Sequence, residues 1–184
     1  MEKEEVKEEE KEIEEEKTER NPIIDLAIFV IKAFCVVAVL IKFVFMPCVV
    51  NGSSMVPTYN DGEYGYSFIV TKNLGIHRFD TAVIKLDTEE EKLLVKRVIG
   101  MPGETVEYKD NKLYINGEHL EEDFLTGVTT NDFKVELGQD EYYCLGDNRN
   151  ISRDSRFYGP FEKKQIVSTH LMIIYPFSSF AYHQ

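Results

Sequence analysis

The longest run of mainly apolar residues lies near the N-terminus, at residues 23–41. As a helix, these 19 residues would reach about 28 Å, close to the thickness of a bilayer core. Asn21 and Pro22 precede the run as a capping residue and a first-turn proline. Lys32 lies mid-span, where it must snorkel or pair. We predict one transmembrane helix within residues 21–46. The alternative is a buried core helix, but a small domain could hardly cover a helix that is apolar on every side.

Beyond residue 47 the pattern changes to short apolar segments separated by turn residues. The segments are rich in Val, Ile, Tyr and Phe and are bounded by Gly, Pro and Asp, as is typical of strands. Residues 109–112 and Asn116-Gly117 indicate turns, and residues 118–138 indicate loops with a short edge strand. Strands are predicted at residues 64–72, 81–86, 93–99, 105–108, 113–115, 141–145 and 171–175. Residues 47–184 therefore predict a compact, mostly β domain.

The first 20 residues are strongly acidic. They hold eleven Glu against four Lys and one Arg, so -6 of the net charge of -12 lies there. A segment with so few apolar residues cannot bury a core, so we expect residues 1–20 to form a disordered or loosely helical tail. The remainder is mildly acidic, which argues against nucleic-acid binding because such binding needs a basic patch.

Basic residues around the apolar run predict its orientation in a cell membrane. Five Lys and Arg precede the run, whereas none lies between Phe43 and Gly62. Because Lys and Arg stay on the cytoplasmic side, we expect a cytoplasmic N-terminus and an extracytoplasmic β domain. A cleaved signal peptide is a poor alternative, since the leading region is long and acidic and no A-x-A site follows the run.

Cysteine and histidine usage restricts the candidate chemistry. The three cysteines, Cys35, Cys48 and Cys144, fit no zinc spacing and predict inert thiols, with a Cys48–Cys144 bridge left open. None of the four histidines stands beside a Ser, Cys or Asp in a triad-like arrangement, which argues weakly against a Ser-His-Asp enzyme. No HExxH, P-loop or GxGxxG motif occurs in the sequence, so metalloprotease and nucleotide-binding functions have no support.

Two short segments carry candidate chemistry. Gly52 and Pro57 flank Ser54, which would place the Ser54 hydroxyl on a rigid turn with backbone N–H groups near for an oxyanion. Lys96 lies in a predicted strand, where alternation places it on one face with Leu94 and Val98. Apolar neighbours could lower its pKa by the about 3 units that a base near pH 7 needs. A plain turn and a solvated edge-strand lysine are the alternatives.

Three ordered motifs resemble those of type I signal peptidases. Gly52-x-Ser54-Met55-x-Pro57-Thr58 resembles the nucleophile box of that family. Residues 96–104 are similar to its lysine box, K-R-[VA]-[IV]-G-x-P-G-[DE], and residues 146–156 to its third signature, G-D-N-R-x-x-S-x-D-S-R. The similarity covers residues 22–176, and the short gap between the last two motifs resembles the compact form of Gram-positive bacteria.

The resemblance implies a serine endopeptidase with an antiparallel β fold and a Ser/Lys dyad. Ser54 would be the nucleophile and its backbone N–H an oxyanion donor, with Lys96 as the general base. Ser152 would orient the lysine, while Asp154 and Arg156 would brace the site. The implied substrates are secreted preproteins, cut after a small-x-small motif as they leave the translocation machinery. A hydrophobic surface near the site would rest on the lipid bilayer, and no metal or cofactor is needed.

Two departures from the family pattern leave questions open. Gly52 stands where some members have a serine whose hydroxyl completes the oxyanion hole. The second hydrogen-bond donor to the oxyanion is therefore left open, with Ser53 as a weak candidate. Arg78-Phe79-Asp80 replaces a frequent R-G-D, which we expect to alter a turn or its packing.

Three other functions compete with the active peptidase. The main alternative is a catalytically inactive, membrane-tethered relative that binds preproteins or translocation partners. A self-cleaving Ser/Lys repressor would need a DNA-binding domain, and the sequence has a hydrophobic span instead. A sortase would need a reactive cysteine with His and Arg partners, which Cys144 does not obviously have.

Overall fold

The computed structural model describes residues 21–87, 92–125, 130–177 and 181–182. The chain forms two units, Met1–Lys42 and Phe43–Gln184, which are described separately. The predicted acidic tail, residues 1–20, lies outside the described residues.

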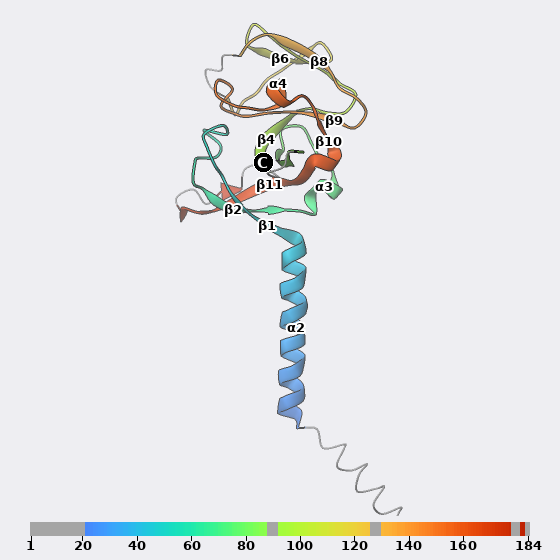
Figure 1. Cartoon of the computed structure of the whole chain (residues 1–184), viewed down its shortest axis with the longest axis vertical. Helices are drawn as coiled ribbons and strands as arrows, with labels where there is room; N and C mark the ends of the chain where they lie inside the picture. The colour runs from blue at the N-terminus through green and yellow to red at the C-terminus, as the bar shows by residue number, and fades with distance from the viewer. Residues whose placement is uncertain (1–20, 88–91, 126–129, 178–180, 183–184) are drawn as a thin grey trace, which may run out of the picture. The chain divides into compact units, whose positions relative to one another are not determined.

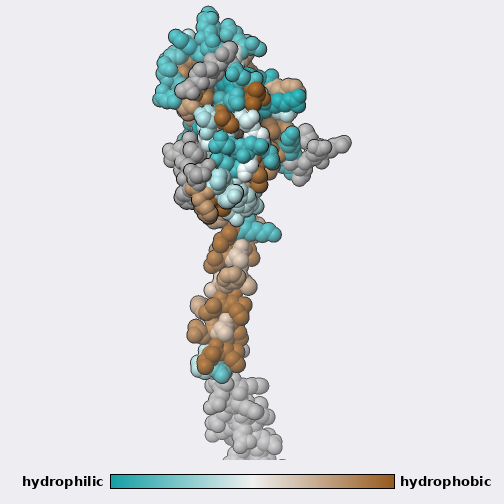
Figure 2. Space-filling view, turned by 90° about the vertical axis from the view of Figure 1, so that its left-hand side faces the viewer, coloured by the Kyte–Doolittle hydropathy of each residue, from teal (hydrophilic) through white to brown (hydrophobic). Residues whose placement is uncertain are grey.

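The first unit contains the predicted apolar helix. Helix α2 (Pro22–Val44) has 23 residues, or about 34 Å of length, and none of its residues is buried. The carboxamide oxygen of Asn21 accepts a hydrogen bond of 3.0 Å from the Ile23 N–H, so the predicted cap forms. Figure 2 shows that the viewed surface of this helix is almost entirely apolar. By length and composition it could cross a membrane.

The second unit is built on a large antiparallel sheet. Its path runs β1-β2-β11-β3-β4-β9-β10, and β12 pairs with β11 beside that path. The strands, in the order of the path, are β1 (Phe45–Val49), β2 (Tyr64–Phe68), β11 (Ile166–Tyr175), β3 (Thr81–Lys85), β4 (Leu93–Gly100), β9 (Glu141–Leu145) and β10 (Phe161–Glu162), with β12 (Ala181–Tyr182). The structure thus confirms a mostly β fold of antiparallel strands.

A smaller antiparallel sheet forms the other end of the β domain (Figure 1). Asp110 and Asn111 form the turn between the two central strands of this sheet, with φ angles of 54° and 60°. Positive φ at both central residues is the conformation that two-residue hairpins favour, and short polar side chains tolerate it. The strands, in spatial order, are β7 (Glu118–Leu120), β6 (Lys112–Ile115), β5 (Thr105–Lys109) and β8 (Phe133–Glu136).

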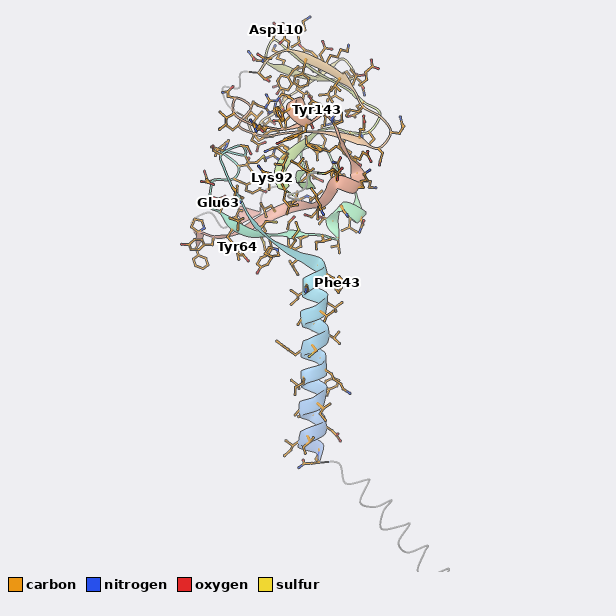
Figure 3. All side chains as sticks on the ribbon, viewed as in Figure 1. Phe43, Glu63, Tyr64, Lys92, Asp110 and Tyr143 are labelled. Atoms are coloured by element: carbon orange, nitrogen blue, oxygen red, sulfur yellow. The ribbon has the colours of Figure 1, made fainter. Side chains whose placement is uncertain are left out.

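Strand β4 lies where the hydrophobic clusters meet. Val98 packs into a cluster with β3 and β11, whereas the next residue, Ile99, packs into the cluster beneath the small sheet. Tyr143 of β9, labelled in Figure 3, belongs to the second cluster. Val95 packs against a third cluster, which contains residues of β1 and of the loop that follows it. The strand that carries Lys96 is therefore held from several sides.

Several local predictions were incomplete. The predicted strand at residues 64–72 ends at Phe68, and a short helix, α3 (Thr71–Leu74), follows it. Helix α2 ends at Val44, within the predicted range, and Pro47 lies in β1, a strand that the sequence did not predict. Proline is tolerated there because β1 is an edge strand, where one side of the backbone needs no ladder partner. The short helix α4 (Ser155–Tyr158) and the first half of β11 were also missed.

Candidate active site

Ser54 lies in the loop between β1 and β2, and its neighbours anchor that loop in the core. Met55 and Tyr59 are 1% and 0% exposed, and the Tyr59 hydroxyl donates a 3.0 Å hydrogen bond to the carbonyl of Leu171. Gly52, with φ of +88°, lets the chain turn into the loop at a conformation that other residues rarely adopt. The Ser54 side chain is therefore held half-buried on a fixed turn.

Lys96 reaches Ser54 from the middle of β4. The strand register places Lys96 opposite Ala82 of β3. The pair Leu94 and Ile84 lies two residues along, on the same face of the sheet. Its side chain lies almost completely inside the protein, with 3% of the residue exposed. A hydrogen bond of 2.6 Å joins Lys96 Nζ to Ser54 Oγ. This is the distance at which a base can take a proton from a hydroxyl nucleophile.

The surroundings of Lys96 make it a usable base. Burial lowers the pKa of Lys96 from 10.5 to about 8, although the carboxylates of Asp154 and Asp147 pull the pKa back up. Desolvation dominates because a charged ammonium loses its hydration inside the protein. With a pKa of about 8, about one molecule in ten carries a neutral lysine at pH 7.

An ion pair next to Lys96 ties three segments together. Arg97 donates to both carboxylate oxygens of Asp147, at 2.8 and 2.7 Å, with side chains that are 2% and 0% exposed. Thr58, in the Ser54 loop, donates to the same carboxylate at 2.5 Å. A buried bidentate pair of this kind fixes geometry, and removing one partner leaves an unpaired buried charge. Arg97 and Asp147 thus join β4, the Ser54 loop and the loop after β9.

The loop after β9 also contacts Ser54 directly. The backbone N–H of Asn148 donates to the Ser54 carbonyl at 3.0 Å. Gly146 allows this approach, since a Cβ there would lie 2.5 Å from the Ser54 carbonyl oxygen and would collide with the Ser152 hydroxyl. The glycine is therefore required by close packing of three chain segments.

Asp154 and Arg156 form a second ion pair beside the site. Arg156 Nε and Nη2 donate to the two oxygens of Asp154 at 2.9 and 2.8 Å, and the Gly146 N–H donates to Asp154 at 3.0 Å. Burial alone would raise the pKa of Asp154, but these hydrogen bonds outweigh it and the pKa is lowered. The Ser152 hydroxyl lies near and helps to lower this pKa, yet Ser152 Oγ makes no hydrogen bond of good geometry to any described residue.

A cleft of about 400 Å³ opens beside Ser54 and Lys96. One wall is formed by residues 47–51 of β1 and the following loop, and the other by residues 92–96 at the start of β4. Lys92, labelled in Figure 3, lies four residues from Lys96 along the second wall. Strand β9 pairs with β4 at Arg97–Gly100, beyond the cleft. The cleft therefore runs along two strand segments and ends at the serine–lysine pair.

The cysteines and His170 are not part of the serine–lysine contact, although the Cys144 thiol is near enough to influence the pKa of Lys96. Cys35, Cys48 and Cys144 are free thiols, so the bridge left open by the sequence is not formed. Within residues 21–87, 92–125, 130–177 and 181–182, no three His, Cys, Asp or Glu side chains gather as metal ligands would. His170 contacts Asp80 at 3.4 Å, away from the serine–lysine pair.

Comparison with known proteins matches this arrangement to one family. A family model described as "Signal peptidase, peptidase S26" matches residues 23–175. The chain belongs to the signal peptidase family. It is 38% identical over 178 residues to signal peptidase I of Bacillus amyloliquefaciens, which covers 90% of this chain and 95% of that protein. It is 34% identical to signal peptidase I S of Bacillus subtilis strain 168, over 88% of this chain and 94% of that protein.

A solved signal peptidase I from Enterococcus faecalis V583 is 34% identical in sequence. The matched region covers 52% of this chain and 96% of the solved chain, and the TM-score is 0.48. As a member of peptidase family S26, the chain is a serine-type peptidase and hence a hydrolase.

The residues selected from the three signal peptidase motifs converge on one place. Ser54 and Lys96 are in contact, and Asp154 and Arg156 are paired beside them. Ser152 lies in the same cluster but makes no hydrogen bond to Lys96 in the described structure.

The sequence did not assign a role to Arg97, Asp147 or Thr58, although all three lie inside the quoted motifs. A buried Arg–Asp pair leaves no periodic signal in sequence. Their position beside Lys96, Gly146 and the Ser54 box was the only available indication.

Proposed function

We propose that this chain is a membrane-anchored signal peptidase in which Ser54 is the nucleophile and Lys96 the general base. The observation that carries the proposal is the 2.6 Å contact between Ser54 Oγ and a lysine amine that is buried from water. A buried lysine is expensive to maintain, and its pKa of about 8 suits proton transfer near neutral pH.

The proposed reaction proceeds through an acyl-enzyme. Ser54 Oγ attacks the carbonyl carbon of the residue before the cleavage site, and neutral Lys96 takes the hydroxyl proton. The resulting ammonium gives that proton to the leaving amine nitrogen as the peptide bond breaks. Lys96 then takes a proton from water as the water attacks the Ser54 ester, and it returns that proton to Ser54 Oγ as the C–Oγ bond breaks and the new C-terminus is released.

The supporting residues have proposed roles in this reaction. The backbone N–H of Ser54 would donate to the oxyanion. The Gly52 N–H already donates to Asp61 at 2.6 Å, so it is not a ready second donor, and the exposed Ser53 remains the candidate. The buried Ser152 hydroxyl, which has no partner of good geometry among the described residues, would orient Lys96 when the amine is protonated.

The cleft supports an extended substrate with small residues near the cut. A peptide lying between the edge strand β1 and the start of β4 could hydrogen-bond to the main chain of both. In an extended peptide, the first and third residues before the cut share one face. Met55, Val83 and Val95 line the cleft near Ser54 with apolar surface, which would suit the small apolar side chains of a small-x-small motif.

The proposed substrates are secreted preproteins, as the relatives' name implies. We propose that α2 spans the cell membrane with the N-terminus in the cytoplasm, because basic residues precede it. The translocation machinery would deliver the substrate on the outer side. Lipid contact is also proposed for the aromatic side chains on one end of the large sheet, where Tyr175 and Phe177 are 59% and 83% exposed.

Cleavage of a preprotein that carries an A-x-A site tests the proposal directly. The full chain in detergent is compared with Ser54→Ala and Lys96→Ala, and Lys85→Ala on the neighbouring strand β3 serves as the control lysine. We expect wild type and Lys85→Ala to cut at the site, as read by mass spectrometry of the product, and the other two variants to be inactive.

Each other outcome points to a different conclusion. An inactive wild type under conditions where a known signal peptidase cuts would favour the inactive preprotein-binding relative. Activity that persists in Lys96→Ala would place the base elsewhere and refute the dyad.

A further inference from the structure

Phe79 adopts a backbone conformation that is unfavourable for an aromatic residue. Its φ angle is +72°, in the left-handed region. Bulky side chains rarely occupy this region, and they do so where the surrounding contacts require it. Phe79 stands where the signal peptidase motif often has a glycine, which would adopt the conformation freely. The side chain must therefore make a contact that holds the backbone there.

That contact is with Phe124. The two rings meet edge to face, with centroids 5.1 Å apart and planes at 67°. The Phe124 ring in turn lies over the guanidinium of Arg97, with 4.2 Å between Arg97 Cζ and the ring centroid. The backbone of Phe79 also contacts Arg97, since Arg97 Nη1 donates a 2.8 Å hydrogen bond to the Phe79 carbonyl. The Phe124 ring thus covers Arg97, and the Phe79 ring packs against Phe124.

The loop that carries Phe124 is joined by an ion pair to the loop after β9, which contains Asp147. Glu122 accepts a 2.5 Å hydrogen bond from Arg149 Nη2, with side chains that are 8% and 0% exposed. Arg149 Nε also donates to the carbonyl of Gly146 at 3.0 Å. The loop from the small sheet is therefore fastened to the segment that holds Asp147.

We propose that Phe124, supported by Phe79, is a positioning residue that fixes the Ser54–Lys96 pair by covering the Arg97–Asp147 ion pair. The inference rests on the proposed serine–lysine function. Arg97 directly follows Lys96 in β4, and its partner Asp147 holds Thr58 of the Ser54 loop. An aromatic ring over a desolvated guanidinium stabilises the cation and excludes water from the ion pair.

Loss of the ring has two expected effects on the reaction. Water would reach Arg97, the bidentate pair would loosen, and the Ser54–Lys96 distance would vary, which lowers kcat about tenfold with little change in KM. Asp147 would be less well neutralised, and its charge raises the pKa of Lys96. The acid limb of the pH–rate profile should then move toward higher pH.

Four variants of the full chain in detergent test the proposal. Phe124→Tyr keeps the aromatic face, Phe124→Leu keeps apolar volume without it, and Phe124→Ala removes both. Phe133→Ala is the matched control, since Phe133 packs on the same cluster but stacks on Tyr108 instead of Arg97. We expect Phe124→Ala and Phe124→Leu to lose kcat and shift the pH profile. Phe124→Tyr and Phe133→Ala should keep both, even if Phe133→Ala melts at a lower temperature.

Two results would overturn the proposal. One is a Phe124→Leu variant that matches Phe124→Tyr in kcat and in pH profile; this comparison stands even if Phe124→Ala does not fold. The other is an equal loss of kcat in Phe133→Ala, which would mark general loss of packing.

A measurement without substrate separates this inference from the proposed function. Nitrogen NMR of the lysine amines, with Lys96→Met to assign the signal, follows the titration of Lys96 directly. An upward shift of that titration in Phe124→Leu, absent in Phe133→Ala, supports the positioning role even if wild type cuts no preprotein. An unchanged titration in Phe124→Leu refutes it.

Discussion

The low pKa of Lys96 predicts that the lysine destabilises the folded protein at neutral pH. The unfolded chain binds the Lys96 proton up to about pH 10.5, whereas the folded chain binds it only up to about pH 8. Between these values the unfolded state holds more protons, so the free energy of unfolding rises with pH. The difference of about 2.5 pH units corresponds to a loss of about 3 kcal/mol in the free energy of unfolding. This loss is fully present below pH 8 and vanishes above pH 10.5.

Replacing Lys96 with methionine should therefore abolish cleavage and raise stability together. Methionine fills a similar volume without a charge, so the variant should gain up to about 3 kcal/mol at pH 7. For a domain of this size, that gain corresponds to a melting temperature roughly 10 °C higher.

Calorimetric melting of wild type and Lys96→Met in the same detergent, at pH 7 and pH 10, provides the assay. The difference in melting temperature should shrink as pH rises from 8 toward 10.5, because wild-type Lys96 becomes neutral in both states. Other groups that titrate in this range cancel between the two proteins. A stability difference that stays constant with pH, or a less stable variant at pH 7, would refute the reasoning.

Three further predictions concern the same site. Cleavage per enzyme should rise about fivefold from pH 7 to 8 and level off above pH 9, as the buried lysine loses its proton; a tenfold rise per unit up to pH 10 would indicate an ordinary lysine. Gly146→Ala should lose activity and melt lower, because its Cβ would collide with the Ser152 hydroxyl and crowd the Ser54 carbonyl; a wild-type profile in cleavage and melting assays would contradict this. Arg97→Lys should be destabilised by about 3 kcal/mol in denaturant titration, since lysine cannot replace the bidentate contact to Asp147; a loss below about 1 kcal/mol would show that the pair is not structural.

The sequence predicted those parts of the fold that have a local cause. The apolar run predicted α2, and Asn21 and Pro22 marked its start correctly. Alternating and β-branched segments predicted most strands, because that pattern reflects one buried face. Strand β1 was missed since it follows the helix directly and contains Pro47, and only pairing with β2 makes it a strand.

The candidate site could be predicted from motifs, but its internal contacts could not. Ser54 and Lys96 are 42 positions apart, and the pairing of β1, β2, β11, β3 and β4 brings their side chains to 2.6 Å from each other. Phe124 lay in a segment predicted as polar loop, and nothing local in that segment indicates a ring over Arg97. Such contacts depend on the tertiary fold, which is why the ion pairs and their aromatic cover emerged only from the structure.

The two ion pairs explain how a lysine can be buried next to two carboxylates and still have a low pKa. Asp147 and Asp154 each raise the pKa of Lys96, and either one without a counter-ion would hold the ammonium in its charged form. Each carboxylate is bound by its own arginine, Arg97 or Arg156, and the charge of Arg156 also lowers the pKa of Lys96 directly, while burial remains the largest effect. An arginine lost from either pair would therefore impair the base as well as the fold, because the lysine would regain its proton at neutral pH.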